Sequence, residues 1–200
     1  MRYAAGVVLV TIATMILAVP VWAVDRDLWA TTLFSGPLSE SSLGDTITGQ
    51  ATWPGSVLAG IAVSRKFDAV KSWFGPLKEW LDFELEAQAV KHFGRQNHWE
   101  LNGLFILRWL PFPWDAYMDT SLALGEGISY ALDVPDVEAI GRPDTPKTLN
   151  YLLFELTFSP PESPDLAFVL RLHHRSGVFG FFDDKRDASN AIVAGVRFAF

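Results

Sequence analysis

The sequence predicts an all-β fold, an eight-stranded antiparallel transmembrane β-barrel. Three observations support this prediction. Eight segments alternate apolar and polar residues, half of all residues are hydrophobic, and the last segment ends on an aromatic residue, Phe200. Beyond the N-terminal segment, the chain has no run of the ~18 or more apolar residues that a membrane-spanning helix needs. A barrel strand needs only alternate apolar residues on its lipid face, so a barrel can hold this hydrophobic excess.

The N-terminal segment has the features of a secretory signal peptide. It begins with the positive pair Met1-Arg2, continues with an apolar run over 4–18, and ends with small residues around Ala23. We therefore predict cleavage after Ala23, which divides the chain into a signal peptide (1–23) and a barrel domain (24–200). The alternative is a retained membrane anchor, but the apolar run is short for a spanning helix.

The eight predicted strands are justified by their alternation and by the turn residues between them. The first alternates least, and the third and fourth most regularly: apolar residues from Leu81 to Ala89 face carboxylates and an amide on the third strand. The fifth, sixth and seventh carry leucine and phenylalanine on one face, and the eighth places Phe198 and Phe200 opposite Arg197. The predicted ranges are 28–35, 56–67, 80–92, 98–110, 117–130, 148–158, 165–175 and 190–200.

Charged residues on the polar faces predict a narrow interior filled by side chains. Glu84, Glu86, Arg108 and Glu155 would point inward and pair across the lumen, since an unpaired buried charge is costly. An open porin channel is therefore disfavoured. A soluble lipocalin-like barrel, with its apolar face inside, is the alternative that periodicity alone leaves open. The signal peptide and the terminal phenylalanine favour the membrane.

Connection lengths set the predicted orientation. Short, proline-rich connections follow the fourth and sixth strands, and longer ones follow the first, fifth and seventh. Outer-membrane barrels have short periplasmic turns and longer outside loops, so both termini of the barrel domain would be periplasmic and the odd-numbered strands would run outward. The segment 68–79 predicts a short amphipathic helix at the inner interface. An aromatic girdle would gather at that level, formed by Trp73, Trp80, Trp109, Trp114 and Tyr117.

Composition excludes several functions. The net charge of −7 argues against nucleic-acid binding, and the absence of cysteine excludes thiolate metal sites and a cysteine nucleophile. No metal-binding motif stands out, so we assign neither a metal nor a cofactor from the sequence.

A polar pair interrupts the apolar face of the seventh strand. His174 and Ser176 continue the outward parity of Leu170 and Leu172, so both would project from the barrel exterior near the outer leaflet. An imidazole beside a hydroxyl can act as general base for a serine nucleophile. Asn190, which begins the last strand with the same parity, could hold the second imidazole nitrogen. The alternative is that these polar groups only meet lipid headgroups.

The motif His174-Arg175-Ser176, at the end of the penultimate strand of an eight-stranded barrel, resembles the lipid A 3-O-deacylase family, the PagL-type esterases. The resemblance implies an outer-membrane enzyme that hydrolyses the 3-O-linked acyl chain of lipid A, with Ser176 as nucleophile and His174 as base. The family completes its triad with a glutamate near the start of the last strand, where this chain has Asn190.

Other acidic residues could supply the missing charge. Glu126 shares the outer face of the fifth strand but would lie two strands from His174, and Asp183, Asp184 and Asp187 belong to the last outer loop. Lys185 and Arg186 in that loop could meet lipid A phosphates.

The leading hypothesis is therefore a serine-type esterase of the bacterial outer membrane. Its expected partners are lipopolysaccharide, the outer-membrane bilayer and, through the last strand, the β-barrel assembly machinery, without nucleic acid. The alternative is a non-enzymatic small outer-membrane barrel, structural or adhesive, with a degenerate deacylase site.

Overall fold

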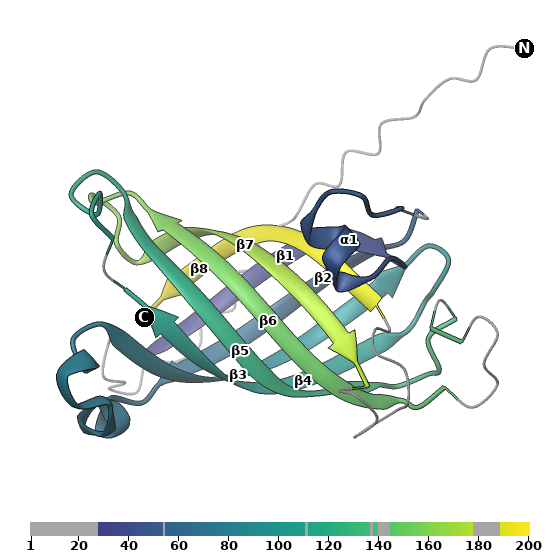
Figure 1. Cartoon of the computed structure of the whole chain (residues 1–200), viewed down its shortest axis with the longest axis horizontal. Helices are drawn as coiled ribbons and strands as arrows, with labels where there is room; N and C mark the ends of the chain where they lie inside the picture. The colour runs from purple at the N-terminus through teal and green to yellow at the C-terminus, as the bar shows by residue number, and fades with distance from the viewer. Residues whose placement is uncertain (1–27, 54, 111, 137, 140–144, 178–188) are drawn as a thin grey trace, which may run out of the picture.

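The chain forms a closed antiparallel barrel in which each strand pairs with its neighbours in sequence and β1 closes on β8 (Figure 1). This computed structural model describes residues 28–53, 55–110, 112–136, 138–139, 145–177 and 189–200, so the predicted signal peptide lies outside the described residues. The strands are β1 Trp29–Ser39, β2 Val57–Lys66, β3 Leu81–Phe93, β4 Trp99–Trp109, β5 Asp119–Ala131, β6 Thr148–Ser159, β7 Leu166–Ser176 and β8 Ser189–Ala199.

The predicted fold class is confirmed, and the largest difference in strand bounds is at β1. This strand continues to Ser39 through Gly36 and Pro37, which read as turn residues. A side chain at Gly36 would lie 2.0 Å from the carbonyl oxygen of Ile192 on β8. Glycine therefore allows the two strands to approach closely here. In a sequence, a glycine with this role looks the same as a glycine in a turn.

The outer wall is apolar and the interior is polar. Phe105 and Phe168 expose 51% and 58% of their surface, whereas Glu84 and Arg171 expose 2% and 1%. This is the arrangement of a barrel in lipid and the reverse of a lipocalin, whose apolar side chains face inward.

Two arginines organise the charged interior, as predicted for inward glutamates and arginines. Arg108 donates to Glu84 and to Glu155, at 2.7 Å each. Arg171 donates to Glu86 at 2.9 Å and also pairs with Glu155. Each buried charge thus has an opposite charge in contact, which offsets the cost of removing it from water.

A short helix lies at each end of the barrel (Figure 1). Helix α1 (Leu43–Ile47) belongs to the β1–β2 connection, and its first turn is capped by the Ser42 hydroxyl, which accepts from the Asp45 N–H at 3.1 Å. At the opposite end, η1 (Asp68–Leu77) is a 3₁₀ helix with a kink at Gly75. The predicted helix over 68–79 is therefore present, in the tighter 3₁₀ form. No helix among the described residues has both the length and the apolar character needed to cross a membrane.

The end of the barrel that carries η1 also has aromatic residues. Trp80 and Trp109 pack edge to face with ring centroids 5.3 Å apart. Trp73 and Phe74 of η1 line a shallow apolar pocket on the outer wall together with Phe105 of β4. Both observations suit a level where the barrel meets the lipid interface.

Candidate active site

His174 and Asn190 form a hydrogen-bonded pair on the outer side of the barrel wall. They lie directly opposite each other in the β7–β8 ladder, and His174 Nδ1 is 2.6 Å from Asn190 Oδ1. His174 continues the outward parity of Leu170, yet exposes only 4% of its surface, and Asn190 exposes none. The two side chains therefore point outward but are covered.

Part of the cover is the start of the β1–β2 connection. The Asn190 amide group donates through Nδ2 to the backbone carbonyl of Ser41, at 2.7 Å. Because a carbonyl can only accept, this contact fixes the amide with its nitrogen on Ser41 and its oxygen on His174. An amide oxygen also only accepts, so His174 must carry a proton on Nδ1. In the neutral imidazole, Nε2 then carries the lone pair and is the nitrogen that can act as a base.

Ser176 ends β7, two residues after His174 and on the same face. It is 6% exposed. Its cross-strand partner on β6 is Asn150, whose side chain also points outward and hydrogen-bonds the Glu126 carboxylate. The structure thus brings Ser176, His174 and Asn190 together at one end of the wall, as the parity of the strands indicates. Their catalytic role stays a prediction.

Glu126 lies two strands away from His174. It is paired with Leu152, which in turn is paired with His174, so its carboxylate contacts Asn150 rather than the imidazole. The acidic and basic residues of the last outer loop, namely Asp183, Asp184, Lys185, Arg186 and Asp187, lie outside the described residues.

Sequence analysis missed the cover over this site and the amide on β6. Ser39, Ser41 and Ser42 read as loop residues, but Ser39 is paired with Asn190 and is fully buried. The available signal was parity: Ser39 continues the outward face of β1, and Asn150 continues that of β6. Extending the first predicted strand by four residues would have placed Ser39 opposite Asn190, and Asn150 already lay within the predicted sixth strand.

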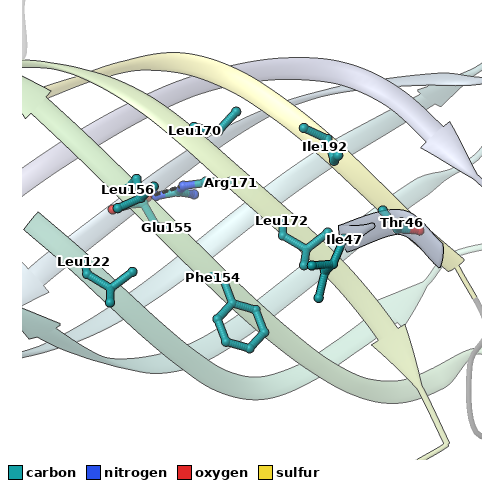
Figure 2. A pocket seen from close by; sticks show the side chains of 10 residues that line it. All are labelled: Thr46, Ile47, Leu122, Phe154, Glu155, Leu156, Leu170, Arg171, Leu172 and Ile192. Carbon is teal, nitrogen blue, oxygen red and sulfur yellow. Dashed lines mark hydrogen bonds and ion pairs between the residues drawn. The ribbon is translucent and has the colours of Figure 1, made fainter. Parts of the chain in front are cut away.

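An apolar groove adjoins the site on the outer wall. It is about 230 Å³ in volume and begins two residue pairs along the ladder, at the next outward-facing pair, where Leu172 lies opposite Ile192 (Figure 2). Phe154 of β6 lines it from the side, and Ile47 of α1 lies over it. The groove has the shape and apolar lining of a site for part of a hydrocarbon chain.

The lumen behind the site is densely polar. His173 points inward, where the Tyr151 hydroxyl is 3.0 Å from its Nδ1. Arg175 is paired with Glu138 at 2.7 Å, and burial raises the pKa of Glu138 although Arg175 opposes the shift. Burial lowers the pKa of His98, in the β3–β4 connection, to about 4, with His92 adding to the effect, so its imidazole is neutral at pH 7.

The closed eight-stranded barrel with an apolar outer wall belongs to the class of outer-membrane-type β-barrels. Among solved structures, the chain is similar to the outer membrane enzyme PagL, with a TM-score of 0.59 and 10% identity over 86% of this chain and 99% of the other. It is also similar to Neisserial surface protein A, with a TM-score of 0.52 and 12% identity over 87% and 97%. No protein-family model and no curated protein matches the sequence. At these identities the likeness shows the fold alone.

Proposed function

We propose that the chain is a bacterial outer-membrane esterase that hydrolyses the 3-O-linked acyl chain of lipid A in lipopolysaccharide. The observation that carries the proposal is the His174–Asn190 pair, 2.6 Å apart, beside Ser176 on the outward side of the wall and next to an apolar groove. Such a site suits a substrate that brings an ester and an acyl chain together. The likeness of the fold to an outer-membrane enzyme, and the resemblance of the His174-to-Ser176 motif to the deacylases, support lipid A as that substrate.

The reaction follows the chemistry of serine esterases. The Ser176 Oγ attacks the ester carbonyl while His174 Nε2 accepts its proton, and Asn190 accepts from Nδ1–H and so keeps the lone pair on Nε2. The tetrahedral oxyanion then collapses, and His174 returns the proton to the departing alkoxide. Water activated by the same imidazole hydrolyses the acyl-enzyme and releases the fatty acid.

The oxyanion needs hydrogen-bond donors that are in place before the reaction. We assign this role to N–H groups around Ser176, with the Asn150 side chain as a further donor from the neighbouring strand. Of the 176–178 turn, in which we expect the backbone donors, Val178 lies outside the described residues.

The cellular setting is part of the proposal. Export by the signal peptide 1–23 and insertion by the β-barrel assembly machinery, through the last strand, would place β7 running outward. Its end at Ser176 would then lie in the outer leaflet, where lipid A is.

The direct test is incubation of the folded barrel in detergent with lipopolysaccharide, followed by mass spectrometry of lipid A. We expect the loss of one hydroxyacyl chain from the 3-position. A parallel incubation with phosphatidylethanolamine separates lipid A deacylation from general lipase activity. Unchanged lipid A with the folded protein would support the alternative, a non-enzymatic structural or adhesive barrel.

A filled groove is expected to weaken substrate binding. Leu172→Trp places an indole where the groove begins, and we expect kcat/KM for lipid A to fall about tenfold, mainly through KM, since the acyl chain loses apolar contact. Phe168→Trp is the matched control, because Phe168 is on the same face of β7 but does not line the groove. Equal rates for the two variants would show that the groove does not bind the acyl chain.

Loss of the amide at position 190 is expected to slow the chemical step. Asn190→Ala frees the imidazole to rotate and to change tautomer, and we expect kcat to fall about 10–100-fold with KM nearly unchanged. Asn190→Asp keeps an oxygen acceptor on Nδ1–H but loses the donor to the Ser41 carbonyl, so it should retain part of the rate that Asn190→Ala loses. Steady-state kinetics at several pH values measure both effects. Full activity in Asn190→Ala would contradict an orienting role.

A further inference from the structure

Three of the four histidines in the chain lie inside the barrel, close to one another at its outer end. His92 near the end of β3 is paired with His98, which precedes β4, and Glu100 follows two residues later with the same inward parity. One potential ligand atom from each of the three lies within 4.8 Å of the other two. All three side chains are at most 3% exposed.

The contacts in this cluster have the spacing of a metal site. His92 Nε2 is 2.9 Å from Glu100 Oε2, and the His92 and His98 rings stack with centroids 4.3 Å apart. Ligand atoms of a tetrahedral zinc ion lie roughly 3.3 Å apart, given zinc–nitrogen bonds of about 2.0–2.1 Å. Ring lone pairs lie in the ring planes, so at least one of the two nearly parallel imidazoles must rotate out of the stack for all three groups to point at one ion.

Two buried polar atoms in the cluster, His98 Nε2 and Gln96 Oε1, have no hydrogen-bond partner within the described part of the chain. Glu100 Oε1 lies 3.0 Å from His173 Nε2, so that carboxylate oxygen and that ring nitrogen pair with each other. Buried polar atoms are nearly always satisfied, so the two without a partner mark a place for a further group, an ion or a water. A bound cation would satisfy the nitrogen of His98 and the carboxylate together.

Neighbouring side chains can also fix the required tautomers. Gln96 Nε2 is 2.8 Å from His92 Nδ1, and after a 180° rotation of the amide the unpartnered oxygen of Gln96 would accept a hydrogen bond from Nδ1–H. His92 Nε2 would then be free to bind a metal, held by an outer-shell amide as metal-bound histidines commonly are. Arg175 is 3.8 Å from Glu100, but its charge is balanced by Glu138.

We propose that His92, His98 and Glu100 bind a divalent transition-metal ion, best Zn²⁺, inside the outer end of the barrel, with His173 positioning the carboxylate. Two imidazoles and a carboxylate form a set that suits Zn²⁺ better than Ca²⁺ or Mg²⁺, which prefer oxygen ligands. With three protein ligands, the fourth position is open to water. The ion would tie the β3–β4 hairpin together on the lumen side of the wall, and the inference does not depend on the proposed esterase activity.

The test is metal binding by the folded full-length barrel in detergent, after removal of metal with a chelator. Co²⁺, which reports tetrahedral coordination by its visible absorption, is titrated first and then displaced with Zn²⁺. We expect one equivalent bound by the wild type, and a loss of at least about a hundredfold in affinity in His98→Gln and in His92→Gln, because each removes a ligand. His174→Ala is the matched control: this histidine faces outward, one residue from His173, and its removal should leave binding intact.

Folding of each variant is checked by circular dichroism and by its heat-dependent gel mobility. Zinc X-ray absorption on the wild type needs no variant and should show two imidazoles at about 2.0 Å. An all-oxygen shell, no binding by the folded wild type, binding unchanged in His98→Gln, or equal loss in His174→Ala would each overturn the proposal.

Discussion

Ser176→Ala is expected to abolish release of the hydroxyacyl chain, lowering the rate by about three orders of magnitude or more. The hydroxyl is the proposed nucleophile, and no other group at position 176 can form the acyl-enzyme. His174→Ala should have a similar effect, because without the base the hydroxyl is not activated. The measurement is the initial rate of lipid A deacylation, by mass spectrometry, on protein whose folding has been verified.

The double variant of Ser176 and His174 tests whether the two residues act as one catalytic unit or contribute independently to the rate. Residues that act as one unit are strongly non-additive, so Ser176→Ala with His174→Ala should be no slower than either variant alone. Ser163→Ala is the control, since Ser163 is exposed in the β6–β7 turn at the opposite end of the barrel. Wild-type activity in Ser176→Ala would exclude a serine mechanism at this position.

The largest effect on stability is expected at Glu155. This fully buried carboxylate pairs with both Arg108 and Arg171, so Glu155→Leu leaves two guanidinium groups with one partner fewer in the lumen. Removing one partner of a buried ion pair costs about 3–5 kcal/mol. We expect the free energy of unfolding to fall by that amount, measured by urea titration of the barrel in liposomes.

A double variant tests the charge balance of the lumen, and a variant at an exposed glutamate serves as the control. Glu155→Leu combined with Arg171→Met should recover part of the loss, because it removes the excess positive charge that Glu155→Leu leaves, although Glu86 then loses its arginine partner. Glu162→Leu, at an exposed position in the β6–β7 turn, should change stability by no more than about 0.5 kcal/mol. Equal unfolding midpoints for Glu155→Leu and the wild type would contradict the role of the charged interior.

The strands were predictable because the barrel has different solvents on its two sides. Lipid outside and polar groups inside force strict alternation, so Leu170 and Arg171 identify their faces without a structure. The exception is the end of β1, where Gly36 serves close approach of β8 and Pro37 pairs with Val57. Both residues have the appearance of a turn, and only the position of the neighbouring strand reveals their use.

The candidate site was partly predictable for the same reason. Parity and adjacency are enough to place Asn190 beside His174. Consecutive strands pair with each other, and their register must bring the apolar residues of both strands to the same face. The carbonyl of Ser41 was not predictable, since a backbone contact from a loop has no side-chain signature. Yet this contact fixes the amide, and through it the imidazole tautomer.

The histidine cluster in the lumen shows what pattern analysis can overlook. His92 and His98 were each placed at the end of a predicted strand, and the five-residue connection between them pairs the two directly. Their common inward parity with Glu100 was available from the sequence. The spacing resembles no familiar metal motif, because the ligands meet across a hairpin ladder.

The claim at the centre of this account is that Ser176 is an activated nucleophile reached from the lipid side. The most direct measurement is reaction of the folded barrel with a long-chain alkyl fluorophosphonate, in which the serine oxygen displaces fluoride from phosphorus, followed by peptide mass spectrometry. We predict a single adduct on Ser176 that is absent in His174→Ala. A folded wild-type barrel left unlabelled at Ser176 under conditions that fully label a known serine esterase would contradict the claim.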